Sequence, residues 1–249
     1  MVREIFYKFF LMIKKMKPSI KFIISGDYNQ LKPVADRISP KTDYANSPAL
    51  FELCDSNKVK LTVCRRADDT FFKLIDFKNI PKLTTSDFNN TTKYETQVHL
   101  AFTNSKRKYI NEVMMKQVWD KRGRKGLKLD ALPYDIQSQE VRLNVGVPVI
   151  SKINCEDMGI INNERFKIND ISYAKFKITM ESEQGKNIII NFSDFQKCFR
   201  VSYAMTIHSC QGKTINEPYT LHEFERYDKH LKYVALSRST SHELIKIMV

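Results

Sequence analysis

The order of apolar and polar segments predicts an α/β protein that contains a β-rich insertion. Apolar strands lead through polar loops into amphipathic helices, as at residues 98–119. Between residues 121 and 199 the helical periodicity gives way to short strands separated by turn residues. The α/β pattern resumes after Val201. We therefore expect a small antiparallel β-barrel inserted into an α/β domain.

The N-terminal third begins with an amphipathic helix. Its apolar residues recur at steps of three and four until Pro18 ends the pattern: Ile5, Phe6, Phe9, Phe10, Ile13 and Met16. A short apolar strand is predicted at residues 21–25, which places Asp27 to Gln30 in the loop at its carboxyl end, where sites form in open α/β sheets. Ser47 and Pro48 are a suitable N-cap and first residue for a helix through Leu53.

The next segments repeat the strand–loop–helix order. A strand is predicted from Leu61, followed by a helix at residues 68–77. Residues 98–102 form a second strand, and Asn104 or Ser105 is expected to cap a helix at residues 106–119.

The β-rich segment follows a basic, flexible stretch at residues 121–126. Its predicted strands are at residues 147–150, 165–168, 175–178 and 188–190, with a hairpin turn at residues 183–186 between the last two. Afterwards we expect a strand at residues 201–205 and a helix from about Gln211.

Composition limits the class of protein. The 249 residues include 42% hydrophobic residues, enough for one or two cores, and the net charge of +13 favours polyanionic partners. Nucleic acid satisfies that charge best and an anionic membrane second, but no run approaches the roughly twenty apolar residues of a membrane span. The five cysteines lack CxxC spacing, which argues against disulfides and a metal site and indicates a reducing intracellular compartment.

Three short segments carry the most specific information. They are Gly26 to Val34 (GDYNQLKPV), Tyr203 to Thr214 (YAMTIHSCQGKT) and Tyr233 to Arg238 (YVALSR). They resemble motifs III, V and VI of superfamily 1 helicases, most closely the RecD-like and Dda-like branch. This resemblance implies RecA-like domains that bind ATP between them and move along single-stranded DNA.

The first motif implies roles near ATP. Gln30 matches the residue that senses the γ-phosphate, and Asp27 would orient its loop. An Asp-x-Asn turn is also ordinary local hydrogen bonding. Gln211 and Gly212 of the second motif would support the ATP site from the other domain.

Arginine fingers are the chemistry that the second RecA-like domain contributes to such an enzyme. Arg66 falls where the family has its motif IV arginine, although Ala67 replaces the usual following glutamine, and Arg238 matches the motif VI arginine. The alternative for each is an ordinary surface arginine.

The resemblance also implies contacts with nucleic acid. Thr206 and His208 match positions that contact DNA, although the family's His-Lys-Ser-Gln-Gly reads His-Ser-Cys-Gln-Gly here. Thr103 and Asn104 resemble a further phosphate-contacting pair, for which helix capping by Asn104 is the simpler explanation. The basic cluster at residues 121–125 either contacts phosphates or is a solvated loop.

The motifs that hold ATP itself are missing. A P-loop needs GxxxxGK followed by Ser or Thr, and the glycine required before Gly212 is replaced by Ile207. An apolar strand ending in the magnesium-binding Asp-Glu is also absent, and in the family a Met like Met1 follows that pair closely. ATP and Mg²⁺ are therefore expected only if the missing N-terminal half is supplied, either as a separately encoded ATP-binding partner or from sequence directly upstream. No ATPase activity is expected of this chain alone.

The resemblance divides the chain into helicase parts. Residues 1–58 would be a remnant of the first RecA-like domain, residues 59–120 and 200–249 the second, and residues 121–199 the inserted β-barrel. The implied function is the C-terminal part of an ATP-dependent DNA helicase moving 5′ to 3′, in DNA replication, repair or recombination. The alternatives are a non-catalytic single-stranded nucleic-acid-binding module and a truncated reading frame. Heavy use of Lys, Asn and Ile hints at a large DNA virus.

Overall fold

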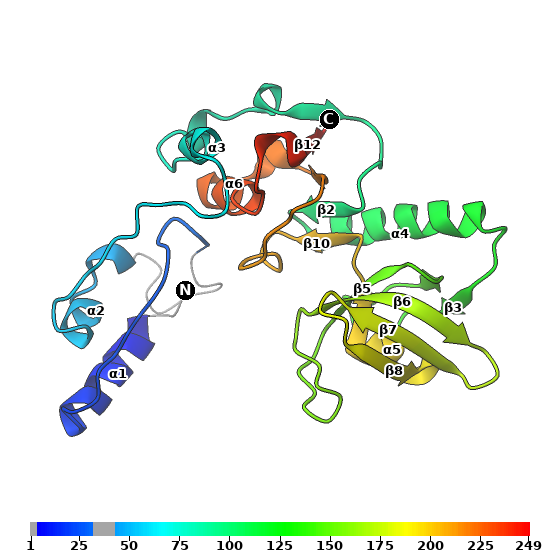
Figure 1. Ribbon diagram of the computed structural model, residues 1–249, viewed down its shortest axis with the longest axis horizontal. Coiled ribbons are helices and arrows are strands. Elements are labelled where there is room, and N and C mark those ends of the chain that lie inside the picture. The colour runs from blue at the N-terminus through cyan, green and yellow to red at the C-terminus, as the bar shows by residue number, and fades with distance from the viewer. Residues whose placement is uncertain (1–3, 32–42) are drawn as a thin grey trace. The chain divides into compact units, whose positions relative to one another are not determined.

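The computed structural model describes residues 4–31 and 43–249, and these form two compact units (Figure 1). One unit comprises Met1–Lys82 and Asp228–Ser237. The other comprises Leu83–Tyr227 and Arg238–Val249. We call them the helical unit and the sheet unit. The end of motif III, from Lys32 to Val34, lies outside the described residues.

The helical unit contains the helices expected near the N-terminus. Its α-helices are α1 (Glu4–Met16), α2 (Pro48–Leu53), α3 (Asp69–Leu74) and α6 (Lys229–Leu236). The Ser47 hydroxyl accepts a hydrogen bond from the Leu50 amide and so caps α2, as predicted. Tyr7 of α1 is buried with Ala49 and Leu53 of α2, which fixes these two helices against each other.

The strands predicted at residues 21–25 and from Leu61 were wrong. Both segments are unpaired, and most of their apolar side chains face solvent: Ile23 is 98% exposed and Leu61 is 89% exposed. Phe22 is the exception, because its ring packs against Phe10 of α1. A strand needs hydrogen-bonded neighbours, and the described residues of the helical unit include no other strand. The helix predicted to reach Phe77 ends at Leu74, and the Phe77 ring packs edge-on against Tyr233 of α6 instead.

The sheet unit is built on a parallel sheet. Its strand order is β1-β12-β11-β2-β10, and every neighbouring pair is parallel. The strands are β1 (Asn89–Thr91), β2 (Val98–Ala101), β10 (Ala204–Thr206), β11 (Tyr219–Leu221) and β12 (Ile245–Met248). The predicted α/β class is therefore confirmed.

Helix α4 (Asn104–Lys121) follows β2 and is longer than expected. Its N-cap is Thr103, whose hydroxyl accepts a hydrogen bond from the Lys106 amide, so the cap predicted at Asn104 or Ser105 is corrected by one or two positions. A hydroxyl in extended backbone one residue earlier serves the same purpose. Asn111 of α4 is fully buried and bonds both to the amide and to the carbonyl of Ala204 in β10.

A second, antiparallel sheet occupies the predicted insertion. Its order is β8-β7-β6-β5-β9, and a separate pair, β3 and β4, lies nearby in the chain. The strands are β3 (Leu127–Leu129), β4 (Val141–Leu143), β5 (Pro148–Ser151), β6 (Arg165–Ser172), β7 (Lys177–Ser182), β8 (Asn187–Asn191) and β9 (Phe199–Val201). The hairpin predicted at residues 183–186 joins β7 to β8. Closure of this sheet into a barrel stays a prediction.

Two local expectations around this sheet were wrong, and one helix, α5 (Phe192–Cys198), was not anticipated. The strand predicted at residues 201–205 is divided between β9 and β10, which belong to different sheets. No helix starts at Gln211, because Gly212 has a φ of +87°, outside the helical region.

Two further observations concern the chain as a whole. Within the described ranges, no helix is long and apolar enough to cross a membrane. All five cysteines are free.

A pair of buried histidines links β2 to the end of β11. His99 Nδ1 lies 3.0 Å from His222 Nε2, both side chains are 0% exposed, and Tyr94 stacks on His222. Burial lowers the pKa of His99 to about 4 and, with the nearby charges of His99 and Lys106, that of His222 to about 3. Both imidazoles are therefore neutral in the folded protein at pH 7.

This pair predicts loss of stability in mild acid. In the unfolded chain the histidines have pKa values near 6.5, so they bind protons at a pH where the two buried imidazoles stay neutral. The contribution of this pair to the free energy of unfolding is therefore fully present above pH 6.5 and is lost as the pH falls toward 4. Each histidine should contribute a loss on the order of 2 kcal/mol between about pH 7 and pH 5. Urea unfolding at both pH values measures it.

The substitution His222→Gln removes one titrating group and should make this pH dependence shallower. His208→Gln, at an exposed position, is the matched control and should leave it unchanged. An equally steep pH dependence in His222→Gln would show that other groups cause the acid sensitivity.

Candidate functional site

The parallel sheet brings most of the predicted nucleic-acid residues to one edge. β2 lies between β11 and β10, and Ala101 is opposite Thr206 in the register. Parallel strands end at the same edge, so the loops after these strands lie side by side. Thr103 and Asn104 follow β2, Thr206 ends β10, and His208 lies two residues beyond it. We call this the sheet edge.

Thr103 is already engaged by a carboxylate of the same chain. Glu223, in the loop after β11, accepts hydrogen bonds from the Phe102 amide (3.1 Å), the Thr103 amide (3.0 Å) and the Thr103 hydroxyl (3.2 Å). Glu223 has a φ of +62°. Both amides bond to its Oε2, whereas Arg226 pairs at 2.6 Å with Oε1, the oxygen that also accepts from the Thr103 hydroxyl at 3.2 Å. A carboxylate at the amino end of α4 is favourable because the helix dipole is positive there. Thr103, and not the expected Asn104, therefore caps α4.

The remaining residues at the sheet edge differ in exposure. His208 is exposed, and the Thr206 hydroxyl exchanges hydrogen bonds with Ser209, including one of 3.2 Å to its Oγ. The Asn104 side chain accepts a hydrogen bond from Arg107 Nε at 3.1 Å. His208 and Asn104 are thus open to a ligand. The basic stretch at residues 121–125 is exposed beyond the end of α4.

Arg238 is packed against the segment of the second motif. Its side chain is 2% exposed, and its Nη1 donates to the Lys213 carbonyl at 3.1 Å. Its own carbonyl accepts from the Ile215 amide at 2.8 Å. Burial lowers the pKa of Lys213 to about 8, and the Lys213 ammonium donates to the Asn163 carbonyl. Gln211 is half-buried and Gly212 is exposed in the same turn.

In the helical unit, the first motif meets α6. The Tyr233 hydroxyl donates to Asp27 Oδ2 at 3.0 Å, and His230 Nδ1 lies 2.9 Å from the Asn29 carbonyl. Gln30 Nε2 donates to the same Asp27 oxygen at 3.4 Å, and Asp27 Oδ1 accepts from the Asn29 amide. Asp27 therefore holds both its own loop and the link to α6.

Arg66 reaches the end of the same helix. Its Nη1 donates to the carbonyl of Ser237, the C-cap of α6, at 2.7 Å. The side chain is otherwise exposed, so its guanidinium has donors available for a ligand. Segments around Asp27, Arg66 and Tyr233, far apart in the sequence, thus meet at α6.

Comparisons with known proteins find similar chains among DNA helicases. The chain is 24% identical to ATP-dependent DNA helicase Pif1 of Campylobacter jejuni over 91% of its own length and 62% of that protein. It superposes on Bacteroides Pif1 bound to ssDNA with a TM-score of 0.71 at 19% identity, covering 99% of this chain and 68% of the other. For Pif1 helicase from Candida albicans the TM-score is 0.69 at 14% identity, over 100% and 69%.

The chain resembles Pif1-like superfamily 1 helicases. The predicted family resemblance is therefore confirmed, and the fold is that of the matching part of these proteins. No family model matches the chain. It spans less than two thirds of the length of the Campylobacter Pif1 relative.

Sequence reasoning missed two residues that make the contacts described above. Glu223 is a carboxylate directly after an apolar strand, a position that could have drawn attention to it. Tyr233 was read only as the first residue of its motif, although its hydroxyl is the atom that reaches Asp27. The partner of neither could be predicted, because each lies more than a hundred residues away.

The Glu223 contacts predict a measurable contribution to stability. Glu223→Ala leaves the Phe102 and Thr103 amides without their acceptor, and removing such a charged acceptor costs about 1.5–3 kcal/mol. Denaturant unfolding measures the change. Glu225→Ala, an exposed carboxylate two residues on, is the control and should change stability by about 0.5 kcal/mol or less. Equal stability of the two variants would contradict a capping role for Glu223.

Proposed function

We propose that this chain is the DNA-contacting and arginine-supplying part of a Pif1-like DNA helicase. In this function it binds single-stranded DNA at the sheet edge and contributes Arg66 and Arg238 to an ATP site. ATP and Mg²⁺ are held by a P-loop half, and hydrolysis drives movement along the strand. The antiparallel sheet of residues 121–199 serves as the inserted barrel of this machine.

The convergence of segments on α6 is the observation that carries the proposal. Asp27 contacts Tyr233, and Arg66 contacts Ser237, the residue before Arg238 in the sequence. A surface arginine and a turn aspartate with only local roles would not bond to the same distant helix. This convergence supports a concerted role for the motif III, IV and VI segments.

Binding of a single strand is supported by the sheet edge and by net charge. His208 and Asn104 are exposed there, and the chain has a net charge of +13. Solved relatives include Bacteroides Pif1 in complex with ADP-AlF3 and ssDNA, with a TM-score of 0.68 at 18% identity. Phosphate contacts of this kind are made without regard to base sequence.

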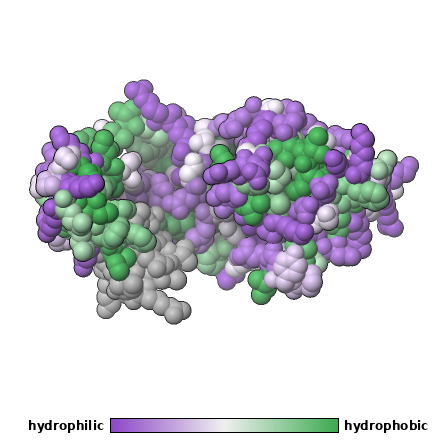
Figure 2. All heavy atoms as spheres, turned by 90° about the horizontal axis from the view of Figure 1, so that it is seen from below, coloured by the Kyte–Doolittle hydropathy of each residue, from purple (hydrophilic) through white to green (hydrophobic). Residues whose placement is uncertain are grey.

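An exposed apolar surface on the helical unit supports a protein partner. Figure 2 shows apolar atoms at the surface around α1 and α2. The exposed apolar residues of this unit include Phe6, Phe9, Met12, Met16, Ile23, Phe51, Val59, Leu61 and Val63. Two of its segments are extended and unpaired, so a partner sheet can add to them through backbone hydrogen bonds. The ATP-binding half is the partner we propose for this surface.

Salt-dependent DNA binding tests the first part of the proposal. Fluorescence anisotropy with labelled oligothymidylate should show affinity that falls steeply as salt rises, because phosphate contacts release counterions. His208→Ala should weaken binding several-fold. His242→Ala, a histidine away from the sheet edge, is the control. Unchanged affinity in His208→Ala would remove this residue from the interface.

ATP hydrolysis tests the second part. With an ATP-binding half supplied, Arg66→Ala and Arg238→Lys should each lower kcat by about a thousandfold or more, the range for arginine fingers. Lysine keeps a positive charge at the buried position of Arg238 and so limits the loss of stability. It lacks the paired N–H donors with which a guanidinium group binds a phosphate. Arg142→Ala, which replaces an arginine already paired with Glu140 at 2.9 Å, is the control. Full activity with both finger residues replaced would show that the arginines have another role.

A further inference from the structure

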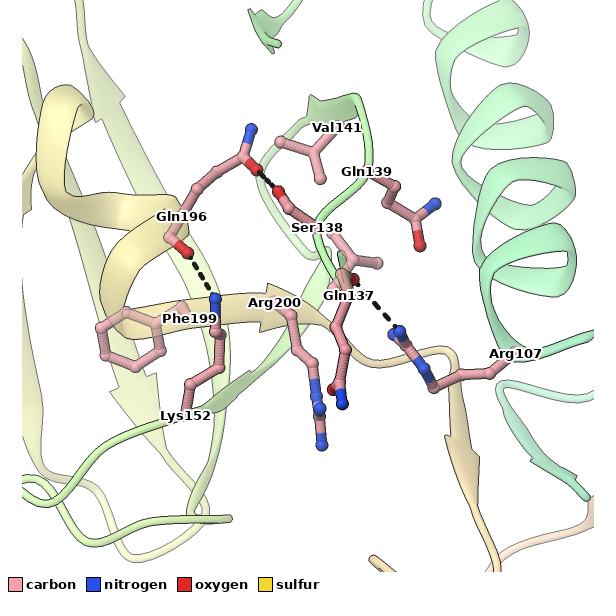
Figure 3. A pocket seen from close by; sticks show the side chains of 10 residues that line it. Arg107, Gln137, Ser138, Gln139, Val141, Lys152, Gln196, Phe199 and Arg200 are labelled. Atoms are coloured by element: carbon pink, nitrogen blue, oxygen red, sulfur yellow. Dashed lines mark hydrogen bonds between the residues drawn. The ribbon is translucent and has the colours of Figure 1, made fainter. Parts of the chain in front are cut away.

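A cationic pocket lies between α4, the loop before β4, and β9 (Figure 3). Among its lining residues three are cationic and none is acidic. The lining residues that matter here are Arg107, Gln137, Ser138, Lys152, Gln196 and Arg200. In Figure 3 Arg107 enters from the side of α4, and Lys152 and Arg200 enter from the side of the antiparallel sheet.

Arg107 is the most buried charge in the pocket. Its side chain is 1% exposed, yet its hydrogen bonds go only to neutral acceptors. Nε donates to Asn104 Oδ1 at 3.1 Å, and Nη2 donates to the Gln137 carbonyl at 3.3 Å. Within the described ranges it forms no ion pair, and its other N–H groups have no acceptor. A buried charge without a counter-ion is costly, and a bound anion would offset that cost.

Arg200 adds a second unpaired guanidinium. It is half-buried on β9, and its side chain forms neither a hydrogen bond nor an ion pair with any residue that the structure describes. Burial lowers the pKa of both guanidinium groups, that of Arg107 to about 10, and the charge of Arg200 adds to the effect on Arg107. The two groups therefore repel each other across the pocket.

The nearest carboxylate does not neutralise them. Asp135 attracts both guanidinium groups, but its Oδ2 is bonded to Lys152 Nζ at 2.5 Å. That ion pair accounts for the charge of Lys152. Arg107 and Arg200 are left as two positive charges without a counter-ion from the described part of the chain.

The walls of the pocket are held in place. The Ser138 hydroxyl donates to Gln196 Oε1 at 2.6 Å, and Lys152 Nζ donates to the Gln196 carbonyl at 2.9 Å. On the other side, Lys108 Nζ donates to the Ser138 carbonyl at 2.8 Å. The cavity between these walls has a volume of about 20 Å³, which fits a single oxygen-sized atom.

We propose that Arg107 and Arg200 bind one phosphate group of a nucleic-acid backbone in this pocket. Planar guanidinium groups suit phosphate oxygens because they donate in a fork. The small cavity takes one non-bridging oxygen and leaves the ester oxygens outside, where the strand continues. The assignment rests on the proposed function, and it adds a contact that none of the three motifs contains.

The substitution Arg200→Gln tests the assignment. Anisotropy with labelled oligothymidylate over a series of salt concentrations should give several-fold weaker binding, and the slope of log affinity against log salt should become shallower by about 0.7. Arg142→Gln is the matched control, because Arg142 of β4 is already paired with Glu140 at 2.9 Å. It should bind as the wild-type chain does. If Arg200→Gln bound the oligonucleotide with wild-type affinity and an unchanged salt slope, the pocket would not be a phosphate site. The proposed function would not be affected by that result.

Thermal unfolding separates the pocket from the proposed function. Without phosphate, Arg200→Gln should be at least as stable as the wild-type chain, because one of two repelling charges is gone. Marked destabilisation would show a structural role and overturn the assignment. Absence of oligothymidylate binding by the wild-type chain would reject the proposed function. If inorganic phosphate then stabilised the wild-type chain but not Arg200→Gln, the pocket would be a free-phosphate site and its assignment to a strand would fall.

Discussion

Parallel pairing of β11, β2 and β10 is the constraint on which the sheet unit depends. These short strands come from opposite halves of the chain, and each is held by backbone hydrogen bonds to a neighbour far away in sequence. Parallel pairing forces their carboxyl ends to one edge. Asn104, Thr206 and His208 are therefore neighbours because of strand direction, without any direct bond between their side chains.

Two polar groups near the start of α4, Glu223 and Arg107, decide how that edge is used. Glu223 occupies the amino end of α4 and satisfies the Phe102 and Thr103 amides, so the helix start is closed to another anion at that point. One turn further along α4, Arg107 is buried without a counter-ion. The amino end of α4 is thus already occupied by the Glu223 carboxylate, whereas Arg107 has no anion beside it. The proposed ligand phosphate would therefore bind at Arg107 and not at the helix start.

The helical unit combines hydrogen-bonded segments with unpaired, exposed ones. Helix α6 gathers the segments of Asp27 and Arg66 through hydrogen bonds, while the extended segments near Ile23 and Leu61 expose apolar side chains. Exposed apolar chain without strand partners is a liability in an isolated protein and an advantage at an interface. We propose that the ATP-binding half covers this surface.

The sequence by itself determined the α/β class, helices α1 and α2, the β7–β8 hairpin and the resemblance to superfamily 1 helicases. These features depend on local periodicity, on capping residues and on motif spacing, all of which are determined by residues close together in the sequence. Tertiary structure alone decided that residues 21–25 and 61–63 are unpaired, that Gly212 ends any helix at Gln211, and that Glu223 reaches Thr103. Strand pairing and buried ion contacts join residues distant in the chain, so no local pattern encodes them.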